Sequence, residues 1–120
     1  VLLKNLREKD ILASLATMSV KPSINLVIDE LNIRDFFHSI TNGLEIRRGK
    51  PDPEIYELAL EKLGLRNEEC VVIEDSIGGV ISAGKSGLDV IGITTSHMAD
   101  ELMDKGCYAT ISTFNDLILA

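Results

Sequence analysis

Two adjacent acids, Glu74 and Asp75, follow a short run of β-branched residues at 71–73 and are the residues of this sequence best placed for chemistry. The run indicates a short strand buried on both faces, as in a parallel sheet under helices. Ligands of open α/β sheets bind beyond the carboxyl ends of the strands. Because neighbouring carboxylates repel unless a cation or a donor compensates, the pair indicates a divalent metal site. The alternative is that the acids face water, or that Asp75 or Ser76 caps the next helix.

Two further sets of polar groups follow predicted strand or loop ends. Thr17 and Ser19 are small hydroxyls where a strand gives way to a helix, and Lys50 ends a basic loop. Carboxyl ends of parallel strands share one edge of the sheet, so we expect these groups to converge with the acid pair. A hydroxyl with free amides, an ammonium and a metal-binding acid pair are the groups needed to hold a phosphoryl group. No nucleophile stands among them.

Residues 79–86 match the phosphate-loop pattern G-x-x-x-x-G-K-[ST] letter for letter. That motif needs its lysine and hydroxyl at the start of a helix, where amides and the helix dipole face the phosphates. Here Gly87 and a strand at 90–94 follow, which places Lys85 and Ser86 at a helix end. We therefore interpret the stretch as part of an apolar helix and not as a nucleotide site.

Isolated residues of reactive types receive a structural interpretation. His38 and His97 have no partner motif, and we expect them to be structural or exposed. Met98 and Met103 fall on one predicted helix face and are interpreted as core. No G-x-G-x-x-G follows any predicted strand, which argues against a dinucleotide site.

Length and composition indicate one soluble globular domain. The chain has 120 residues, of which 45% are hydrophobic and 26% charged. Its net charge of -7 argues against nucleic acid as a partner, because it repels the phosphate backbone. Cys70 and Cys107 are too few and too far apart for a disulfide framework or a zinc site, and reduced thiols favour a cytoplasmic location. No apolar run reaches the roughly 18 residues of a membrane span, so we expect no membrane partner.

Strand and helix patterns alternate along the chain. We predict strands over 11–17, 38–41, 71–73, 90–94 and 108–112, and helices over 21–31, 53–63, 77–86 and 98–105, with a closing helical turn over 114–119. Residues 1–9 are the tail of an amphipathic helix. Asp52 is the expected N-cap of the helix that Gly64 ends. Such alternation predicts an α/β fold with a parallel sheet, right-handed crossovers and helices on both faces.

Two motifs at this spacing are recognisable as those of a known family. The sequence KPDPEIY at 50–56, then VVIEDS at 71–76, with Gly79 and Ala83-Gly84 after it, closely resembles the haloacid dehalogenase superfamily. The nearest subgroup resembles the β-phosphoglucomutase-like phosphatases and phosphomutases, and the similarity runs from about Leu2 to Leu119. The resemblance implies a Mg²⁺-dependent enzyme that acts on small phosphorylated metabolites, such as sugar phosphates, through an aspartyl-phosphate.

The resemblance also implies roles for individual residues. Thr17 matches the second motif of the family, whose hydroxyl binds the transferring phosphoryl group together with the Met18 amide. Lys50 matches the third motif, a lysine that neutralises the charge of the phosphoryl group and the nucleophile. Glu74 and Asp75 match the fourth motif, the acids that hold Mg²⁺.

The sequence departs from the family at its first motif. D-x-D-G-T/V, which supplies the nucleophile and the general acid and base, does not occur here, and neither does a cap domain. We therefore predict that residues 1–120 are part of a core domain, a three-layer doubly wound parallel sheet that lacks its central first strand, and that this segment alone is inactive.

The missing strand would lie between the strand ending at Thr17 and the strand ending at Asp75. Unpaired edges there would cost about 1–3 kcal/mol for each buried unsatisfied group. We expect these two strands to pair directly, to borrow a strand from another copy, or to belong to an incomplete record of a longer protein. The open edges also favour self-association.

Three other functions stay open at this stage. A metal-independent dehalogenase shares the family's scaffold, although retention of both Glu74 and Asp75 argues against it. A receiver-like signalling module uses the same groups, but its acids come first along the chain and its lysine last, whereas here the acids come last. A non-catalytic interaction domain is the third alternative.

Overall fold

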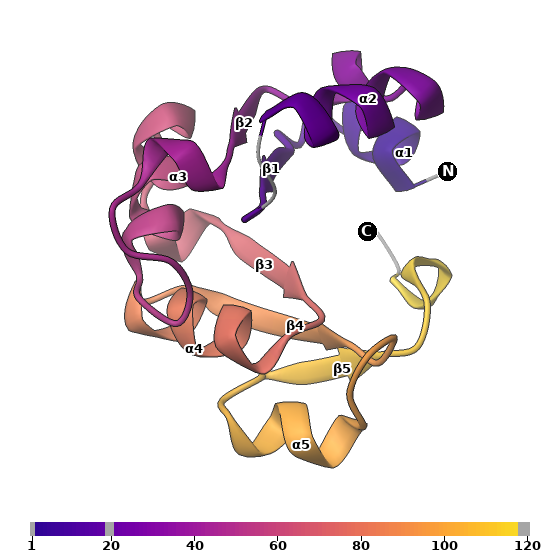
Figure 1. Cartoon of the computed structure of the whole chain (residues 1–120). Coiled ribbons are helices and arrows are strands. Elements are labelled where there is room, and N and C mark those ends of the chain that lie inside the picture. Colours follow the sequence, from indigo (N-terminus) through magenta and orange to yellow (C-terminus); the bar gives the residue numbers. More distant parts are fainter. Residues whose placement is uncertain (1, 19–20, 118–120) are drawn as a thin grey trace.

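The computed structural model describes residues 2–18 and 21–117, and only the backbone of residues 21–24 (Figure 1). Strands and helices alternate as predicted. The strands are β1 (Ser14–Ala16), β2 (Ser39–Thr41), β3 (Val71–Glu74), β4 (Asp89–Ile93) and β5 (Ala109–Ile111). The helices are α1 (Leu2–Glu8), α2 (Lys21–Leu31), α3 (Glu54–Leu63), α4 (Ile77–Lys85) and α5 (Ala99–Asp104). Short 3-10 turns stand at 34–36, 43–45, 67–69 and 114–116. Residues 118 and 119 of the predicted closing turn, and Ser19, lie outside the described residues.

The strands form two parallel sheets. β1 pairs with β2, with Ser14 opposite Ser39, and β3, β4 and β5 pair in that order, with Val71 opposite Asp89. The α/β class and the incomplete sheet are thus confirmed. Of the three alternatives expected for the strands that precede Thr17 and Asp75, direct pairing does not occur, because within the described residues β1 hydrogen-bonds only β2 and β3 only β4. Figure 1 shows these two edges apart.

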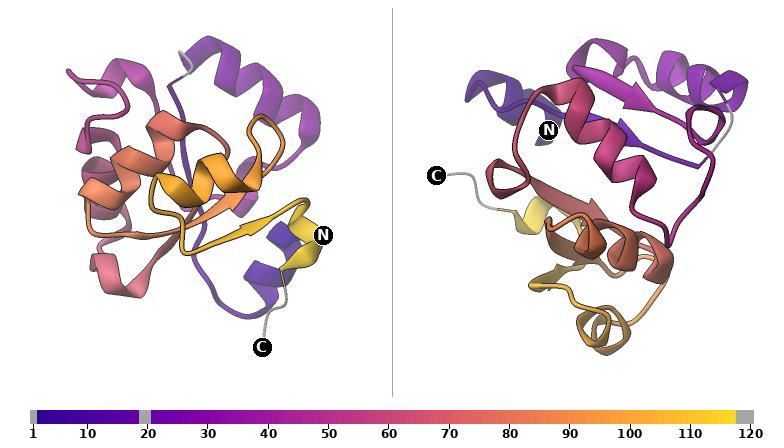
Figure 2. Two further views of the ribbon diagram at one scale, coloured as in Figure 1. Left: turned by 90° about the horizontal axis from the view of Figure 1, so that it is seen from below. Right: turned by 90° about the vertical axis from the view of Figure 1, so that its left-hand side faces the viewer.

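Helix packing connects the two sheets. α3 contacts β1 and β2, α4 contacts β3 and β4, and α5 contacts β4 and β5, while α4 also touches α3 and α5. The three helices therefore form one layer, and Figure 2 shows α4 and α5 side by side against the three-stranded sheet. The core lies under this layer and consists of buried side chains from α3, α4, α5, β4 and the residues before β4 and β5: Ile55, Tyr56, Val80, Ala83, Leu88, Val90, Leu102 and Cys107.

The helix ends follow the local sequence. α3 begins at Glu54, one residue later than predicted, so its N-cap is Pro53 and not Asp52, although Asp52 Oδ1 accepts the Glu54 N–H at 3.0 Å. Gly64 ends this helix with φ of 67°, a left-handed conformation that glycine adopts without strain. Ser76 caps α4 by accepting the Gly79 N–H at 3.0 Å. α4 then ends at Lys85, which confirms that the phosphate-loop-like stretch is helical.

Two burial predictions were wrong. The strand at 71–73 is not buried on both faces: β3 is an edge strand of its sheet, and Val71 is exposed. Met98 and Met103 are 71% and 45% exposed and do not belong to the core. The reason is that α5 is only six residues long and buries a single residue, Leu102, while Met98 precedes the helix as its N-cap.

Candidate functional site

An ion pair joins the two parts of the fold at the predicted site. The Lys50 ammonium lies 2.9 Å from Glu74 Oε2, with side chains only 14% and 7% exposed. Lys50 precedes α3, which packs on β1 and β2, whereas Glu74 ends β3 of the other sheet. Two residues that are 24 positions apart in the sequence therefore meet as expected, although they do so across two sheets and not at the edge of one.

The Glu74 carboxylate has donors on both of its oxygens. Oε2 accepts from the Lys50 ammonium and also from the hydroxyl of Tyr56. Oε1 accepts the Ser76 hydroxyl at 3.1 Å. Behind the carboxylate lies Gly79, where an added Cβ would stand 1.9 Å from Glu74 Cδ. The side chain is therefore held by its partners and by close packing against the first turn of α4.

The same contacts determine the electrostatics of the site. Burial by itself would raise the pKa of Glu74, but the hydrogen bond from Tyr56 and the charge and hydrogen bond of Lys50 outweigh it, and the pKa is lowered. Burial, followed by the nearby Glu74 charge, raises the pKa of Tyr56. Glu74 is thus an anion at neutral pH, and Tyr56 remains a protonated donor beside it.

The loop that carries Lys50 is attached along α4. The Ser82 hydroxyl, fully buried, donates to the Asp52 carbonyl at 2.6 Å, and the Ser86 hydroxyl donates to the Pro53 carbonyl at 3.3 Å. A Cβ added at Gly78 would lie 3.8 Å from Lys50 Cβ, in ordinary van der Waals contact. Two serines of the phosphate-loop-like stretch therefore hold the loop in place through its backbone.

The segment after β1 reaches the same loop. A Cβ added at Gly49 would lie 2.7 Å from Met18 Cε, so the Met18 side chain lies against the residue before Lys50. The Thr17 N–H donates to the Thr41 carbonyl at 2.9 Å, which continues the pairing of β1 with β2 beyond the strand ends. The structure thus brings Met18, Lys50 and Glu74 to one region, with Thr17 and Asp75 as their chain neighbours.

Asp75 differs from its neighbour in its surroundings. Its side chain is exposed, and its Oδ2 accepts the Ser96 hydroxyl at 3.3 Å. Carboxylate oxygens of this kind suit Mg²⁺, which binds through one or two carboxylates and otherwise through water and phosphate oxygens. Asp75 fits such a role, whereas the oxygens of Glu74 are engaged by protein donors. Among the described residues, no three or more His, Cys, Asp and Glu side chains are grouped so that they could hold a metal ion.

Sequence reasoning missed Tyr56, Ser76 as a partner of Glu74, and Gly79 as the surface behind the carboxylate. Tyr56 lies in the first turn of the predicted helix at 53–63, and no motif in the sequence assigns it a polar contact. A tyrosine among aliphatic residues was the only hint, because a buried phenol usually finds a hydrogen-bond partner.

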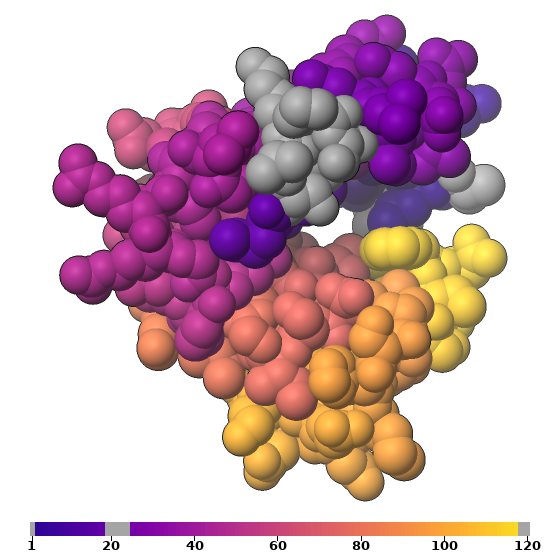
Figure 3. Space-filling view, in the orientation of Figure 1, coloured from indigo at the N-terminus to yellow at the C-terminus, as the bar shows by residue number. Residues whose placement is uncertain are grey.

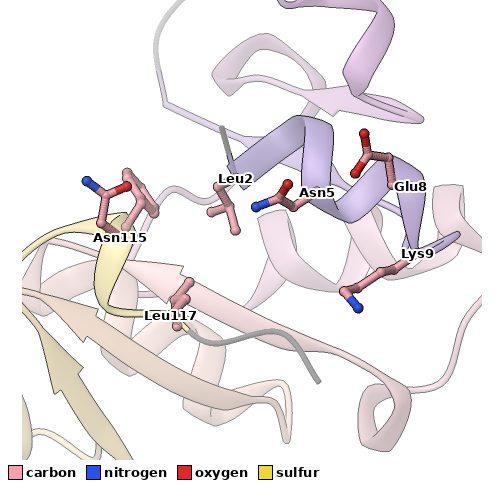
Figure 4. Close-up of a pocket in the computed structure, with 7 residues that line it drawn as sticks. Leu2, Asn5, Glu8, Lys9, Asn115 and Leu117 are labelled. Atoms are coloured by element: carbon pink, nitrogen blue, oxygen red, sulfur yellow. The ribbon is translucent and has the colours of Figure 1, made fainter.

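A separate pocket of about 310 Å³ lies between α1 and the turn at 114–116. Figure 3 shows a notch between the indigo and yellow ends of the described chain, and Figure 4 shows side chains of both segments around the pocket. Its lining residues are Leu2, Asn5, Glu8, Lys9, Phe114, Asn115 and Leu117. None of the predicted site residues contributes to it.

Among the described residues, no helix is long and apolar enough to cross a membrane.

The fold and the motif positions define a parallel α/β core with a lysine–glutamate pair after its strands, and a known family has the same pattern. The profile described as "Haloacid dehalogenase-like hydrolase" matches residues 1–93. The chain belongs to this family.

Individual relatives are phosphatases and phosphomutases. The chain is 32% identical over 111 residues to the phosphorylated carbohydrates phosphatase of Thermotoga maritima, covering 91% of this chain and 51% of that protein. It is 30% identical over 92 residues to the beta-phosphoglucomutase of Bacillus subtilis, covering 77% and 40%. The crystal structure of CbbY from Rhodobacter sphaeroides with xylulose-(1,5)bisphosphate superposes with a TM-score of 0.88 at 27% identity, covering 97% and 52%. The chain thus spans about half the length of these proteins or less.

Proposed function

We propose that this chain is part of a Mg²⁺-dependent phosphoryl-transfer enzyme, a phosphatase or phosphomutase for small phosphorylated metabolites such as sugar phosphates. The observation that carries the proposal is the Lys50–Glu74 ion pair, which forms across the two sheets next to Met18 and Asp75. The names of two relatives support the substrate class, because one is a phosphorylated carbohydrates phosphatase and the other is a beta-phosphoglucomutase.

The chain's own residues have distinct roles in the proposed reaction. The Thr17 hydroxyl and the Met18 N–H bind oxygens of the transferring phosphoryl group. Lys50 supplies a positive charge beside them, and a fixed ammonium stabilises the charge that develops in phosphoryl transfer. Glu74 holds this ammonium in place through its short ion pair.

Asp75 and Glu74 form the metal-binding part of the proposed site. Asp75 is the direct ligand because its carboxylate is exposed, and Glu74 adds negative charge one residue away. A bound Mg²⁺ would neutralise charge on the phosphoryl oxygens.

The nucleophile is an aspartate that the 120 residues do not supply. We propose that it attacks phosphorus to give an aspartyl-phosphate, which water or a second substrate hydroxyl then resolves. The segment alone is accordingly inactive, and it represents part of a core domain in a cytoplasmic enzyme. Its open β1 and β3 edges make self-association of the segment a further expectation.

The test is hydrolysis of a panel of sugar phosphates by the protein expressed from its complete reading frame, with and without EDTA. We expect release of phosphate that EDTA abolishes and that Asp75→Ala reduces by about 100-fold or more. The matched control is Lys85→Ala, which should leave activity within about threefold, since Lys85 is an exposed residue at the end of α4.

Two results would contradict the proposal. If Lys85→Ala removed activity and Asp75→Ala did not, the phosphate-loop interpretation would be the correct one. Release of halide from 2-haloacids without metal, in the absence of phosphatase activity, would establish the dehalogenase alternative.

A further inference from the structure

One buried tyrosine side chain contacts both partners of the central ion pair. Tyr56 lies in the first turn of α3, and its hydroxyl donates to Glu74 Oε2, the same oxygen that accepts the Lys50 ammonium. The Lys50 ammonium also lies 5.3 Å from the centre of the Tyr56 ring. The phenol therefore touches the carboxylate with its hydroxyl and the ammonium with its ring face, an arrangement that favours a cation.

Core packing alone does not explain a tyrosine at this position. Its neighbour Ile55 and the next residue of the stripe, Ala59, are buried aliphatic side chains, and a phenylalanine would fill the same volume as Tyr56. Burying a hydroxyl costs free energy unless it is hydrogen-bonded. The hydrogen bond to Glu74 Oε2 supplies that partner for the Tyr56 hydroxyl.

The remaining contacts leave the carboxylate little freedom. Ser76 donates to Oε1 at 3.1 Å, and there is no room for even a methyl group between Glu74 and Gly79. Tyr56 supplies the second donor on Oε2 and so fixes the direction of that oxygen. Because the lysine side chain is long and flexible, the position of its ammonium depends on where this oxygen is held.

We propose that Tyr56 is a positioning residue of this site: its hydroxyl orients the Glu74 carboxylate and thereby sets the Lys50 ammonium in the place where the transferring phosphoryl group binds. The inference rests on the proposed function for its consequence in catalysis. Its structural part is that the position of the ammonium depends on the hydroxyl, and this part does not rest on the proposed function.

The first experiment removes only the hydroxyl. In the protein expressed from its complete reading frame, Tyr56→Phe should lower kcat on the best sugar phosphate by about 10-fold or more and change KM by less than about threefold. Tyr108→Phe is the matched control, since Tyr108 is 72% exposed, and it should leave both constants within about twofold. An unchanged kcat in a folded Tyr56→Phe protein would overturn the inference.

The second experiment asks whether Tyr56 acts through Glu74. In a double-mutant cycle, Tyr56→Phe should have an effect of less than about twofold on kcat when Glu74→Gln is already present, because the two changes disrupt one arrangement. Fully additive effects would show that Tyr56 acts independently of Glu74. If Tyr56→Phe failed to fold, Glu74→Gln alone must still lower kcat with little change in KM, and the inference is wrong if it does not.

The third measurement does not depend on activity. In ¹⁵N-labelled protein at low temperature and without metal, the ammonium of Lys50 should give an observable ¹⁵N–¹H signal, because a held ammonium exchanges its protons slowly with water. This signal should disappear in Tyr56→Phe and persist in Tyr108→Phe. If the wild-type protein had no phosphatase activity, the proposed function would fail, while loss of the signal would still support positioning. A Lys50 signal that is unchanged in Tyr56→Phe would overturn it.

Discussion

The contact between Gly79 and the Glu74 carboxylate permits a sharp test by a single methyl group. In Gly79→Ala the new Cβ would stand 1.9 Å from Glu74 Cδ and 2.2 Å from Oε2, far inside any real contact. Since Cδ and Oε2 belong to a carboxylate that Lys50 and Tyr56 hold, relief requires the carboxylate to leave its donors. The substitution therefore tests the packing of the whole site.

The expected change in the free energy of unfolding combines two destabilising effects and one stabilising effect. Overpacking in a filled site costs about 1–3 kcal/mol. Loss of one hydrogen bond to a charged group costs about 1.5–3 kcal/mol. Alanine in place of glycine within a helix gains about 1 kcal/mol. We therefore expect Gly79→Ala to lower the free energy of unfolding by about 1.5–5 kcal/mol.

The same helix offers the control. A Cβ added at Gly84 has no atom within 4 Å, and Gly84 is exposed, so Gly84→Ala should raise the free energy of unfolding by up to about 1 kcal/mol. Urea unfolding followed by circular dichroism separates the two variants, because a difference of this size moves the midpoint by roughly 1 M or more. Equal midpoints for Gly79→Ala and Gly84→Ala would show that the Glu74 side chain does not pack where the structure places it.

Three further stability measurements follow from the same structure. Because the pKa of Glu74 is lowered, its carboxylate stabilises the fold above the ordinary glutamate pKa of about 4.3, and this contribution is lost as the pH falls through the lower folded-state pKa. In acid unfolding measured in EDTA, Glu74→Gln should therefore reduce the dependence of stability on pH in that range. Lys50→Met should lower the free energy of unfolding in urea by about 3 kcal/mol, because it leaves a buried carboxylate without its cation. Lys85 is exposed, so Lys85→Met should change the same free energy by less than about 0.5 kcal/mol. In α5, Leu102→Ala should cost about 2–5 kcal/mol by calorimetry and Met103→Ala much less, and the reverse order would contradict the burial assigned to them.

The meeting of Lys50 with Glu74 could be predicted from the sequence, and the reason is topological. The sequence placed both residues after strands of one parallel sheet, whose carboxyl ends share an edge. In the structure they meet across two sheets, because α3, which follows Lys50, packs on β1 and β2 and also on α4. The strand after residue 70 was recognisable from its β-branched run, and Lys50 from its place before the capped helix. The alternation of strands and helices was therefore enough to predict most of the fold and the Lys50–Glu74 pair of the site.

The partners of Glu74 could not be predicted because they depend on how α3 and α4 face each other. Tyr56 lies 18 residues before Glu74 and reads as one more apolar residue of its helix. The exposure of Val71 had a similar cause: a β-branched run is identical in a central strand and in an edge strand, and only the sheet order distinguishes them. Periodicity reports which face of an element is apolar, not what covers it.

The phosphate-loop-like stretch has a structural explanation in this fold. Ser82 of α4 and Ser86, the C-cap of that helix, are four residues apart and so lie on the same side, and they donate to the consecutive carbonyls of residues 52–53. Lys50 precedes these carbonyls and Tyr56 follows them in the first turn of α3. Fixing residues 52–53 against α4 therefore fixes the chain on both sides, and with it the two donors that meet on one carboxylate oxygen. Small hydroxyl side chains at these helix positions are what the close approach of the loop requires, and the resemblance to a nucleotide motif follows from packing and not from phosphate binding.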